Sequence, residues 1–125
     1  MNKDKIILVV DDFSTMRKII RGILKELKYN TILEADDGTT AWEMLQKHRV
    51  DLIISDWNMP AMSGIKFLRT VRSSEEFYDI PFIMVTAEGL KENVVEAIQA
   101  GVSGYIVKPF TAATLEAKMD DAFSK

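Results

Sequence analysis

The sequence predicts an α/β fold in which helices cover both faces of a parallel sheet. Short runs rich in β-branched residues alternate with stretches of helical period, and five such cycles follow one another along the chain. Three of the runs, IILVV, LII and FIMV, are continuously apolar, as expected of central strands with helices on both sides. A length of 125 residues is typical of one domain. We therefore expect a single (βα)5 domain over residues 1–125, doubly wound around its sheet.

The strands are expected at the five short runs, which span residues 6–10, 31–35, 51–55, 81–85 and 103–107. The helix after the first strand is predicted from an apolar stripe of 3.6-residue period. Its members are Phe13, Met16, Ile19, Ile20, Ile23, Leu24 and Leu27. Further helices are expected at residues 38–47, 64–72, 90–100 and 111–123, each introduced by Gly, Pro, Asp, Thr or Ser. No linker, low-complexity segment or longer repeat marks a second module.

Composition excludes several classes of protein. The chain has no cysteine, so neither a disulfide framework nor a thiolate metal site can form, which suits the cytoplasm. Its apolar stretches fall far short of the roughly 20 residues that span a bilayer, and residues 1–5 lead directly into a strand instead of a signal core. The net charge is −3 and the 16 basic residues are scattered, which argues against a nucleic-acid surface. We expect a cytoplasmic monomer without membrane or nucleic-acid partners.

Polar side chains occur at the ends of four expected strands. Asp11 and Asp12 follow the first strand, Asp56 follows the third, Thr86 the fourth and Lys108 the fifth. In an open parallel sheet, ligands bind outside the carboxyl ends of the strands. These five residues are therefore the candidate functional site.

The three carboxylates would repel one another unless cations offset their charge. Lys108 supplies one ammonium group that can pair with a carboxylate. A cluster of oxygen ligands also suits a hard divalent ion, so we expect Mg²⁺. Transition metals are disfavoured because the only histidine, His48, lies near the end of the second expected helix and is interpreted as a solvated residue.

A carboxylate can attack phosphorus to form an aspartyl phosphate if the charge on the transferred group is neutralised. Asp56 is the best candidate nucleophile because it stands alone on the middle strand, whereas the adjacent Asp11 and Asp12 have the pattern of metal ligands. Thr86 could donate its hydroxyl to a phosphoryl oxygen, and Lys108 could supply positive charge. A simpler role for Asp12, as the N-cap of the first helix, is compatible with this function.

The order of these motifs resembles that of response-regulator receiver domains. Members of that family carry an acid pair after strand one, an acceptor Asp after strand three, Thr or Ser after strand four and Lys-Pro after strand five. The similarity covers residues 6–123. The segments closest to the single-domain chemotaxis members are VVDDFSTMR (9–17), SDWNMP (55–60), MVTAE (84–88) and VKPFTAATL (107–115).

The resemblance implies a flavodoxin-like sheet with strand order 2-1-3-4-5, in which the acid pair and Asp56 converge between strands one and three. It also implies that Asp56 is phosphorylated and that Mg²⁺ is held by Asp12, Asp56 and the backbone carbonyl of Asn58, with Asp11 acting through water. A cis peptide bond is expected before Pro109. One departure is Ser63, where many receivers have Asp, although Ser63 can still cap the next helix.

The resemblance further implies a switch that is not an enzyme in the usual sense, because it catalyses its own phosphorylation and dephosphorylation. The expected partners are a chemotaxis histidine kinase, which donates from phosphohistidine, a flagellar motor switch protein and a dedicated phosphatase. Tyr105, otherwise an ordinary strand aromatic, resembles the family's rotameric switch residue. The expected switch and partner-binding residues are Thr86, Gly89, Tyr105, Val107, Phe110, Thr111 and Lys118.

Two alternative functions remain to be weighed. One is an Mg²⁺-dependent aspartyl-phosphate phosphatase, since enzymes of the haloacid dehalogenase type also use an Asp at a strand end. Those enzymes resemble Asp-x-Asp at the nucleophile, whereas the residue two positions after Asp56 is Asn58, which cannot act as the general acid. The other is a receiver-like interaction module that never accepts phosphate, which the intact acidic site, Thr86 and Lys108 disfavour.

Overall fold

The computed structural model describes residues 4–87 and 89–124, and in these residues strands and helices alternate five times. The elements are β1 (Ile6–Val10), α1 (Ser14–Glu26), β2 (Thr31–Ala35), α2 (Gly38–Lys47), β3 (Leu52–Asp56), α3 (Gly64–Arg72), β4 (Phe82–Thr86), α4 (Lys91–Gln99), β5 (Gly104–Val107) and α5 (Ala112–Phe123). Glu88 of the MVTAE segment and the outermost residues of the expected 1–125 domain lie outside the described residues.

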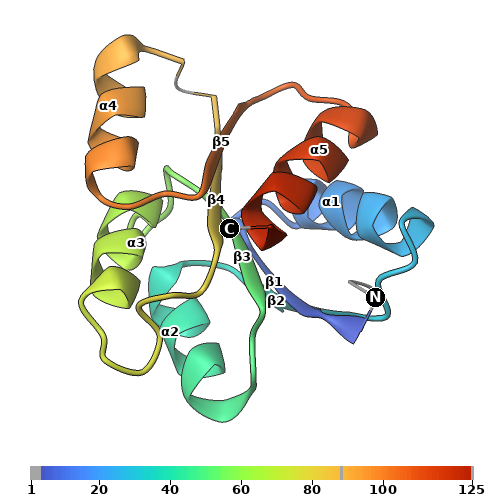
Figure 1. Cartoon of the computed structure of the whole chain (residues 1–125), viewed down its shortest axis with the longest axis horizontal. Helices are drawn as coiled ribbons and strands as arrows, with labels where there is room; N and C mark the ends of the chain where they lie inside the picture. The colour runs from blue at the N-terminus through green and yellow to red at the C-terminus, as the bar shows by residue number, and fades with distance from the viewer. Residues whose placement is uncertain (1–3, 88, 125) are drawn as a thin grey trace.

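The strands form one parallel sheet in the order β2-β1-β3-β4-β5, which confirms the expected topology (Figure 1). The register sets the carboxyl ends of neighbouring strands side by side. Val10 at the end of β1 pairs with Ala35 of β2 and with Ser55 of β3, and Thr86 at the end of β4 pairs with Val107 of β5. Residues that end or follow these strands therefore share one edge of the sheet.

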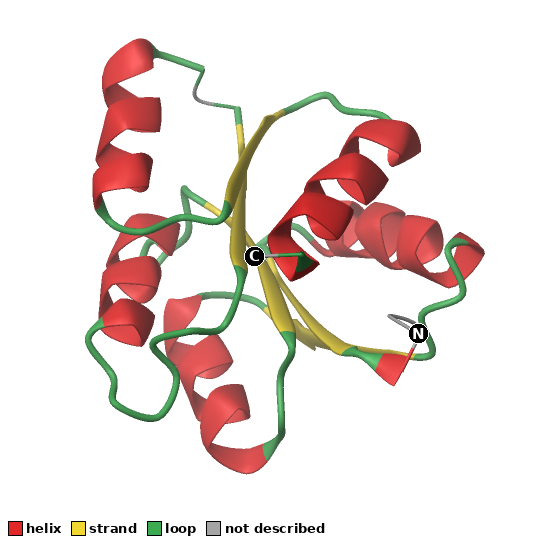
Figure 2. Ribbon diagram, in the orientation of Figure 1, coloured by secondary structure: helices red, strands yellow, loops and turns green. Residues whose placement is uncertain are grey.

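Side chains alternate between two cores because successive residues of a strand point to opposite faces. Helices α2, α3 and α4 cover one face, and α1 and α5 cover the other, with the strands between them (Figures 1 and 2). On the first face, Leu8, Ile53 and Phe82 pack with Leu45 of α2 and Phe67 of α3. The second core contains Ile7, Val9, Leu52, Ile54, Ile83, Val85 and Ile106 with Ile20, Leu24, Leu115 and Met119. In the described ranges, no helix combines the length and apolar character needed to cross a membrane.

Several expected boundaries are wrong by one residue. β3 and β4 begin one residue later than expected and end on Asp56 and Thr86. Asp51 stays outside β3, where its carboxylate accepts a 2.7 Å hydrogen bond from the backbone N–H of Ile6. Pro81 has no N–H to donate to a neighbouring strand. Three further elements, α4, β5 and α5, also begin one residue later than expected, at Lys91, Gly104 and Ala112. The helix α4 ends at Gln99, one residue before the expected Ala100.

The predicted stripe of the first helix is wrong at two positions. Phe13 precedes α1 as its N-cap residue and is 70% exposed, and Ile19 is 50% exposed. Ile20 and Leu24 are the buried members, with Met16, Ile23 and Leu27 partly buried against the same core. Ile19 is turned away because adjacent helical residues differ by about 100° in direction, so Ile19 and Ile20 cannot both face the centre of the core.

Candidate functional site

The site is assembled from the carboxyl ends of β1, β3, β4 and β5. Asp11 extends the pairing of β1 with β2, because its N–H donates a 3.1 Å hydrogen bond to the carbonyl of Ala35. Lys108 is held in the same way, since its N–H donates to the Thr86 carbonyl at 2.8 Å. Main-chain hydrogen bonds at the carboxyl ends of the strands therefore hold the backbones of Asp11 and Lys108 near Asp56.

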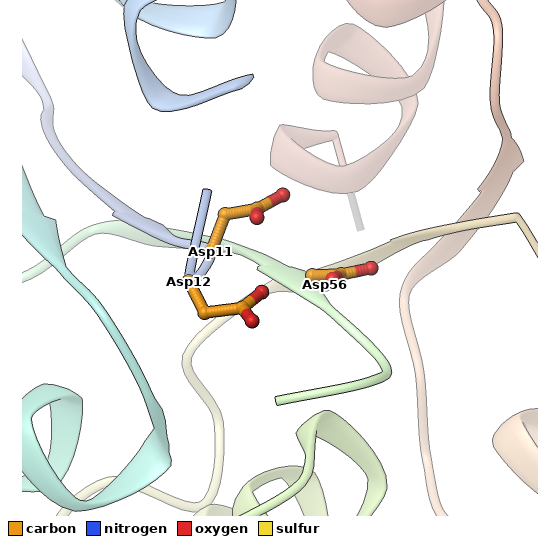
Figure 3. Close-up of side chains that lie close together, drawn as sticks. All are labelled: Asp11, Asp12 and Asp56. Atoms are coloured by element: carbon orange, nitrogen blue, oxygen red, sulfur yellow. The ribbon is translucent and has the colours of Figure 1, made fainter. Parts of the chain in front are cut away.

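Asp11, Asp12 and Asp56 form a compact acidic cluster. Each offers one carboxylate oxygen, and these oxygens all lie within 4.8 Å of one another, so one ion could contact all three. Figure 3 shows the three side chains extending from neighbouring strand ends. Asp11 and Asp56 are buried, whereas Asp12 is exposed. The chain therefore brings together its three sequence-predicted carboxylates, with Asp12 on the solvent side.

Lys108 bridges the two buried carboxylates. Its ammonium Nζ donates to Asp11 Oδ2 at 3.2 Å and to Asp56 Oδ1 at 3.3 Å. The sequence predicted a pair with one carboxylate, and the tertiary structure adds the second. The peptide bond between Lys108 and Pro109 is cis, which confirms the expectation drawn from the resemblance.

The electrostatic balance of the cluster favours a further cation. Burial raises the pKa of Asp56 above its ordinary value, the nearby Asp11 carboxylate raises it further, and Lys108 and the Trp57 N–H act in the opposite direction. One ammonium group therefore does not fully offset the buried negative charge. The ligand set contains only oxygen, which fits a hard divalent ion such as Mg²⁺ better than a transition metal.

The simpler role weighed for Asp12, as the N-cap of α1, is not the one that the structure gives it. The N-cap residue of α1 is Phe13, and that position has no side-chain cap. The local hydrogen bond is made by Asp11, whose Oδ1 accepts from the Phe13 N–H at 2.9 Å. Asp side chains commonly accept from the backbone amide two residues further on, and the Asp12 carboxylate lies beside that of Asp56.

The loop after β3 is held tightly against the acceptor strand. The Gly64 N–H donates a 2.7 Å hydrogen bond to the carbonyl of Trp57. A Cβ at Gly64 would overlap the carbonyl oxygen of Asp56 and lie 2.9 Å from the Trp57 Cα. Ser63 caps α3 as expected, accepting from the Lys66 N–H at 3.3 Å. Sequence analysis took Gly64 only as the start of a helix, and a glycine placed soon after the acceptor strand was the available signal.

The expected partner-binding residues do not all lie on the same face of the sheet. Gly89 lies beside Val107, which is 42% exposed, and Lys118 lies beside Gly104. Thr111 caps α5, and Thr86 is fully buried. Phe110 instead packs partly buried against the core formed by α1 and α5.

Tyr105 is half-buried against the opposite core, with its ring edge-on to Trp57 at 6.4 Å between centroids. Sequence reasoning named Tyr105 but missed this contact, which connects β5 to the residue after Asp56.

A protein-family model described as the response regulator receiver domain matches residues 7–120. The chain is 53% identical over 125 residues to the chemotaxis protein CheY-3 of Vibrio cholerae, covering all of this chain and 96% of that protein. It is 51% identical over 119 residues to the chemotaxis protein CheY of Pseudomonas aeruginosa, covering 95% of this chain and 96% of that protein.

Solved structures of receiver domains are also similar to this chain. The chemotaxis response regulator CheY4 of Vibrio cholerae superposes with a TM-score of 0.87 at 34% identity, over 95% of this chain and 98% of that one. The receiver domain of a sensor histidine kinase from Pseudomonas aeruginosa superposes with a TM-score of 0.88 at 28% identity, over 98% and 99% of the two chains. That receiver domain holds a magnesium ion in its active site cleft.

Proposed function

Because the chain belongs to the response regulator receiver family, we propose that its buried Asp56 is the residue that accepts a phosphoryl group. The protein is a CheY-like chemotaxis response regulator receiver, a phospho-accepting switch and not a classical enzyme. The observation that carries the assignment to Asp56 is its position at the end of β3, where it contacts the Lys108 ammonium and shares a cluster with Asp11 and Asp12.

In the proposed reaction a carboxylate oxygen of Asp56 attacks the phosphorus of a phosphohistidine. The new O–P bond forms as the N–P bond breaks, and the imidazole of the donor leaves with the bonding electron pair. Lys108 neutralises charge on the transferred group, and the Thr86 hydroxyl donates to one of its oxygens. Water later attacks the phosphorus, the bond from phosphorus to the Asp56 oxygen breaks, and inorganic phosphate leaves as the carboxylate is regenerated.

Mg²⁺ is the proposed cofactor. It would be held by Asp12, Asp56 and the backbone carbonyl of Asn58, with Asp11 acting through water, and when bound it would offset negative charge on the phosphoryl oxygens. Support comes from the three carboxylates within 4.8 Å of one another and from the magnesium-bound receiver domain of the Pseudomonas aeruginosa kinase. The protein's own residues position and orient the reacting groups.

A phosphatase acting on outside substrates is less well supported. Such an enzyme needs a general acid near the nucleophile, and the residue two positions after Asp56 is the exposed amide Asn58. The site therefore suits a single transfer onto the protein better than repeated turnover.

The proposed partners follow from the similarity to chemotaxis proteins. A chemotaxis histidine kinase would donate the phosphoryl group, and a flagellar motor switch protein would bind the face made by α4, β5 and α5. That face exposes Val107 and Ile98. We also propose a dedicated phosphatase, a cytoplasmic location and a single domain over residues 1–125.

Mass spectrometry after treatment with acetyl phosphate and Mg²⁺ tests the acceptor. We expect the wild type to gain one phosphoryl group and Asp56→Asn to gain none, because the amide is not a nucleophile. Asp79→Asn, an exposed aspartate on the loop before β4, is the matched control and should be modified like the wild type. Modification of Asp56→Asn at the wild-type rate would refute the assignment. Catalytic release of phosphate from added phosphomonoesters would support the phosphatase.

A further inference from the structure

Arg17 connects the acidic loop to the neighbouring strand. Its Nη1 donates a 2.6 Å hydrogen bond to the backbone carbonyl of Asp11, and its Nε donates to Glu34 Oε1 at 3.1 Å. Glu34 lies on β2 and also pairs with Arg21, one helical turn further along α1, at 3.0 Å. Only 19% of the Arg17 side chain is exposed. The guanidinium is therefore fixed on one side by Glu34 and holds the Asp11 carbonyl on the other.

The carbonyl that Arg17 holds belongs to the peptide group linking Asp11 to Asp12. The orientation of that peptide plane fixes where the Asp12 Cα lies and which way its side chain leaves the backbone. Asp11 is anchored independently, by Lys108 and by the Phe13 and Ala35 backbones. Asp12 is exposed, and its backbone is the part of the loop that the Arg17 contact orients.

We propose that Arg17 is a positioning residue that orients the Asp12 carboxylate for cation binding, with Glu34 fixing the guanidinium in place. The inference rests on the proposed function, because it takes the acidic cluster as the metal site. Groups that orient metal ligands without touching the ion typically change metal affinity by about 10- to 100-fold when removed. The contact with Asp11 acts one residue away from the ligand, so we expect the lower end of that range.

The charge of Arg17 and its proposed positioning role predict opposite changes in Mg²⁺ affinity when Arg17 is replaced. A guanidinium close to a cation site repels the cation, so an effect of charge alone would make Mg²⁺ bind more tightly once Arg17 is neutralised. Loss of positioning would make Mg²⁺ bind more weakly. The sign of the change therefore separates the two explanations.

The test compares Mg²⁺ dissociation constants, measured by calorimetric titration, for wild type, Arg17→Met, Arg17→Lys and Arg21→Met. Methionine keeps an unbranched stem without donors or charge, and lysine keeps the charge but loses the fork that reaches both acceptors. Arg21→Met is the matched control, because Arg21 pairs with Glu34 without contacting Asp11. Thermal unfolding in EDTA establishes that each variant is folded.

We expect Arg17→Met to bind Mg²⁺ about 10-fold more weakly than the wild type, Arg17→Lys to lie between them, and Arg21→Met to match the wild type. The difference should persist at high salt, where charge effects are screened. The phosphorylation rate of the variants at saturating Mg²⁺ should approach the wild-type rate. Unchanged or tighter binding by Arg17→Met would overturn the inference while leaving the metal site intact, and absence of Mg²⁺ binding by the wild type would overturn both.

Discussion

At the scale of single residues, the site is a set of buried charges that are only partly compensated. Asp11 and Asp56 are buried beside one another, and a single ammonium from Lys108 contacts both. Removing carboxylates from water is costly unless opposite charge and hydrogen bonds replace the lost solvation. The free protein therefore holds Asp56 in an environment that opposes its ionisation, and a cation or a phosphoryl group changes that balance.

The raised pKa of Asp56 predicts how the stability of the metal-free protein depends on pH. Burial and Asp11 make the folded protein bind a proton at Asp56 more tightly than the unfolded chain does. The contribution of Asp56 to folding is therefore most favourable at low pH and is lost as pH rises through the raised pKa. In metal-free buffer we expect Asp56→Asn to have a larger free energy of unfolding than the wild type at pH 7, measured with urea.

The same shift can be measured directly at the carboxyl group. In metal-free buffer, an NMR titration of Asp56 should give a midpoint above 3.8, the ordinary aspartate value. A midpoint at or below 3.8, or an Asp56→Asn variant less stable than the wild type at pH 7, would contradict the raised pKa.

Two glycines allow a matched test of the loop that supports Asp56. A Cβ at Gly64 would overlap the Asp56 carbonyl, whereas one at Gly22 in the middle of α1 would meet nothing within 4 Å. Gly64→Ala should lower the free energy of unfolding by about 1–3 kcal/mol through overpacking and slow phosphorylation by displacing the end of β3. Gly22→Ala should stabilise the protein by about 0.5–1 kcal/mol. Equal unfolding midpoints for the two variants in urea would contradict the close approach.

At the scale of elements, the end of each strand determines which chemistry it contributes. β3 and β4 end on Asp56 and Thr86, while β1 and β5 end just before Asp11 and Lys108. The edge strand β5 also carries Tyr105, which reaches across to Trp57. A structural change at the site can therefore be transmitted to β5 through the contact between the rings of Trp57 and Tyr105.

Tyr105 provides a test of communication between the site and the proposed partner face. We expect a motor-switch peptide to bind the beryllofluoride-activated wild type more tightly than the unmodified protein, with a coupling free energy of about 1–3 kcal/mol. Tyr105→Ala should reduce that coupling while leaving phosphorylation largely unchanged. Tyr78→Ala is the control, because Tyr78 is 58% exposed on the loop before β4. Fluorescence anisotropy measures both affinities, and equal wild-type affinities for the two states would refute the switch.

At the scale of the whole molecule, the sheet lies between two hydrophobic cores, and the functional site lies at the carboxyl ends of its strands. Both cores include residues of β1, β3 and β4, so the strands that supply Asp11, Asp56 and Thr86 are buried on both faces. Dense packing on both sides resists displacement of these strands. Binding at the edge should therefore stabilise the whole fold and not a single loop.

Mg²⁺ should raise the free energy of unfolding of the whole domain. A ligand that binds only the folded state stabilises it by about 2.7 kcal/mol when present at about 100 times its dissociation constant. Thermal unfolding with increasing MgCl₂ measures this effect, with NaCl added to keep ionic strength constant. Asp12→Ala should remove most of the shift and Asp79→Asn should keep it. A shift that survives in Asp12→Ala would place the bound ion elsewhere.

The sequence predicted the kinds of element and the members of the acidic cluster because both depend on local patterns. Apolar runs and helical stripes reflect the burial of neighbouring residues, and the carboxyl ends of parallel strands must meet at one edge. The strand order came from the resemblance, since no local pattern specifies which strands are neighbours. Ile19 and Phe13 were misplaced because an apolar residue at the edge of a stripe can face either solvent or core.

The sequence by itself therefore determined that Asp11, Asp12, Asp56, Thr86 and Lys108 gather at one edge of a five-stranded sheet. Only the tertiary structure decided that Lys108 bridges two carboxylates, that Asp11 accepts from the Phe13 N–H, and that Arg17 holds the carbonyl between Asp11 and Asp12. Each of these contacts depends on sub-ångström differences in where chain segments lie after packing. Hydrogen bonds form only within a narrow range of distance and angle, which residue spacing along the chain does not specify.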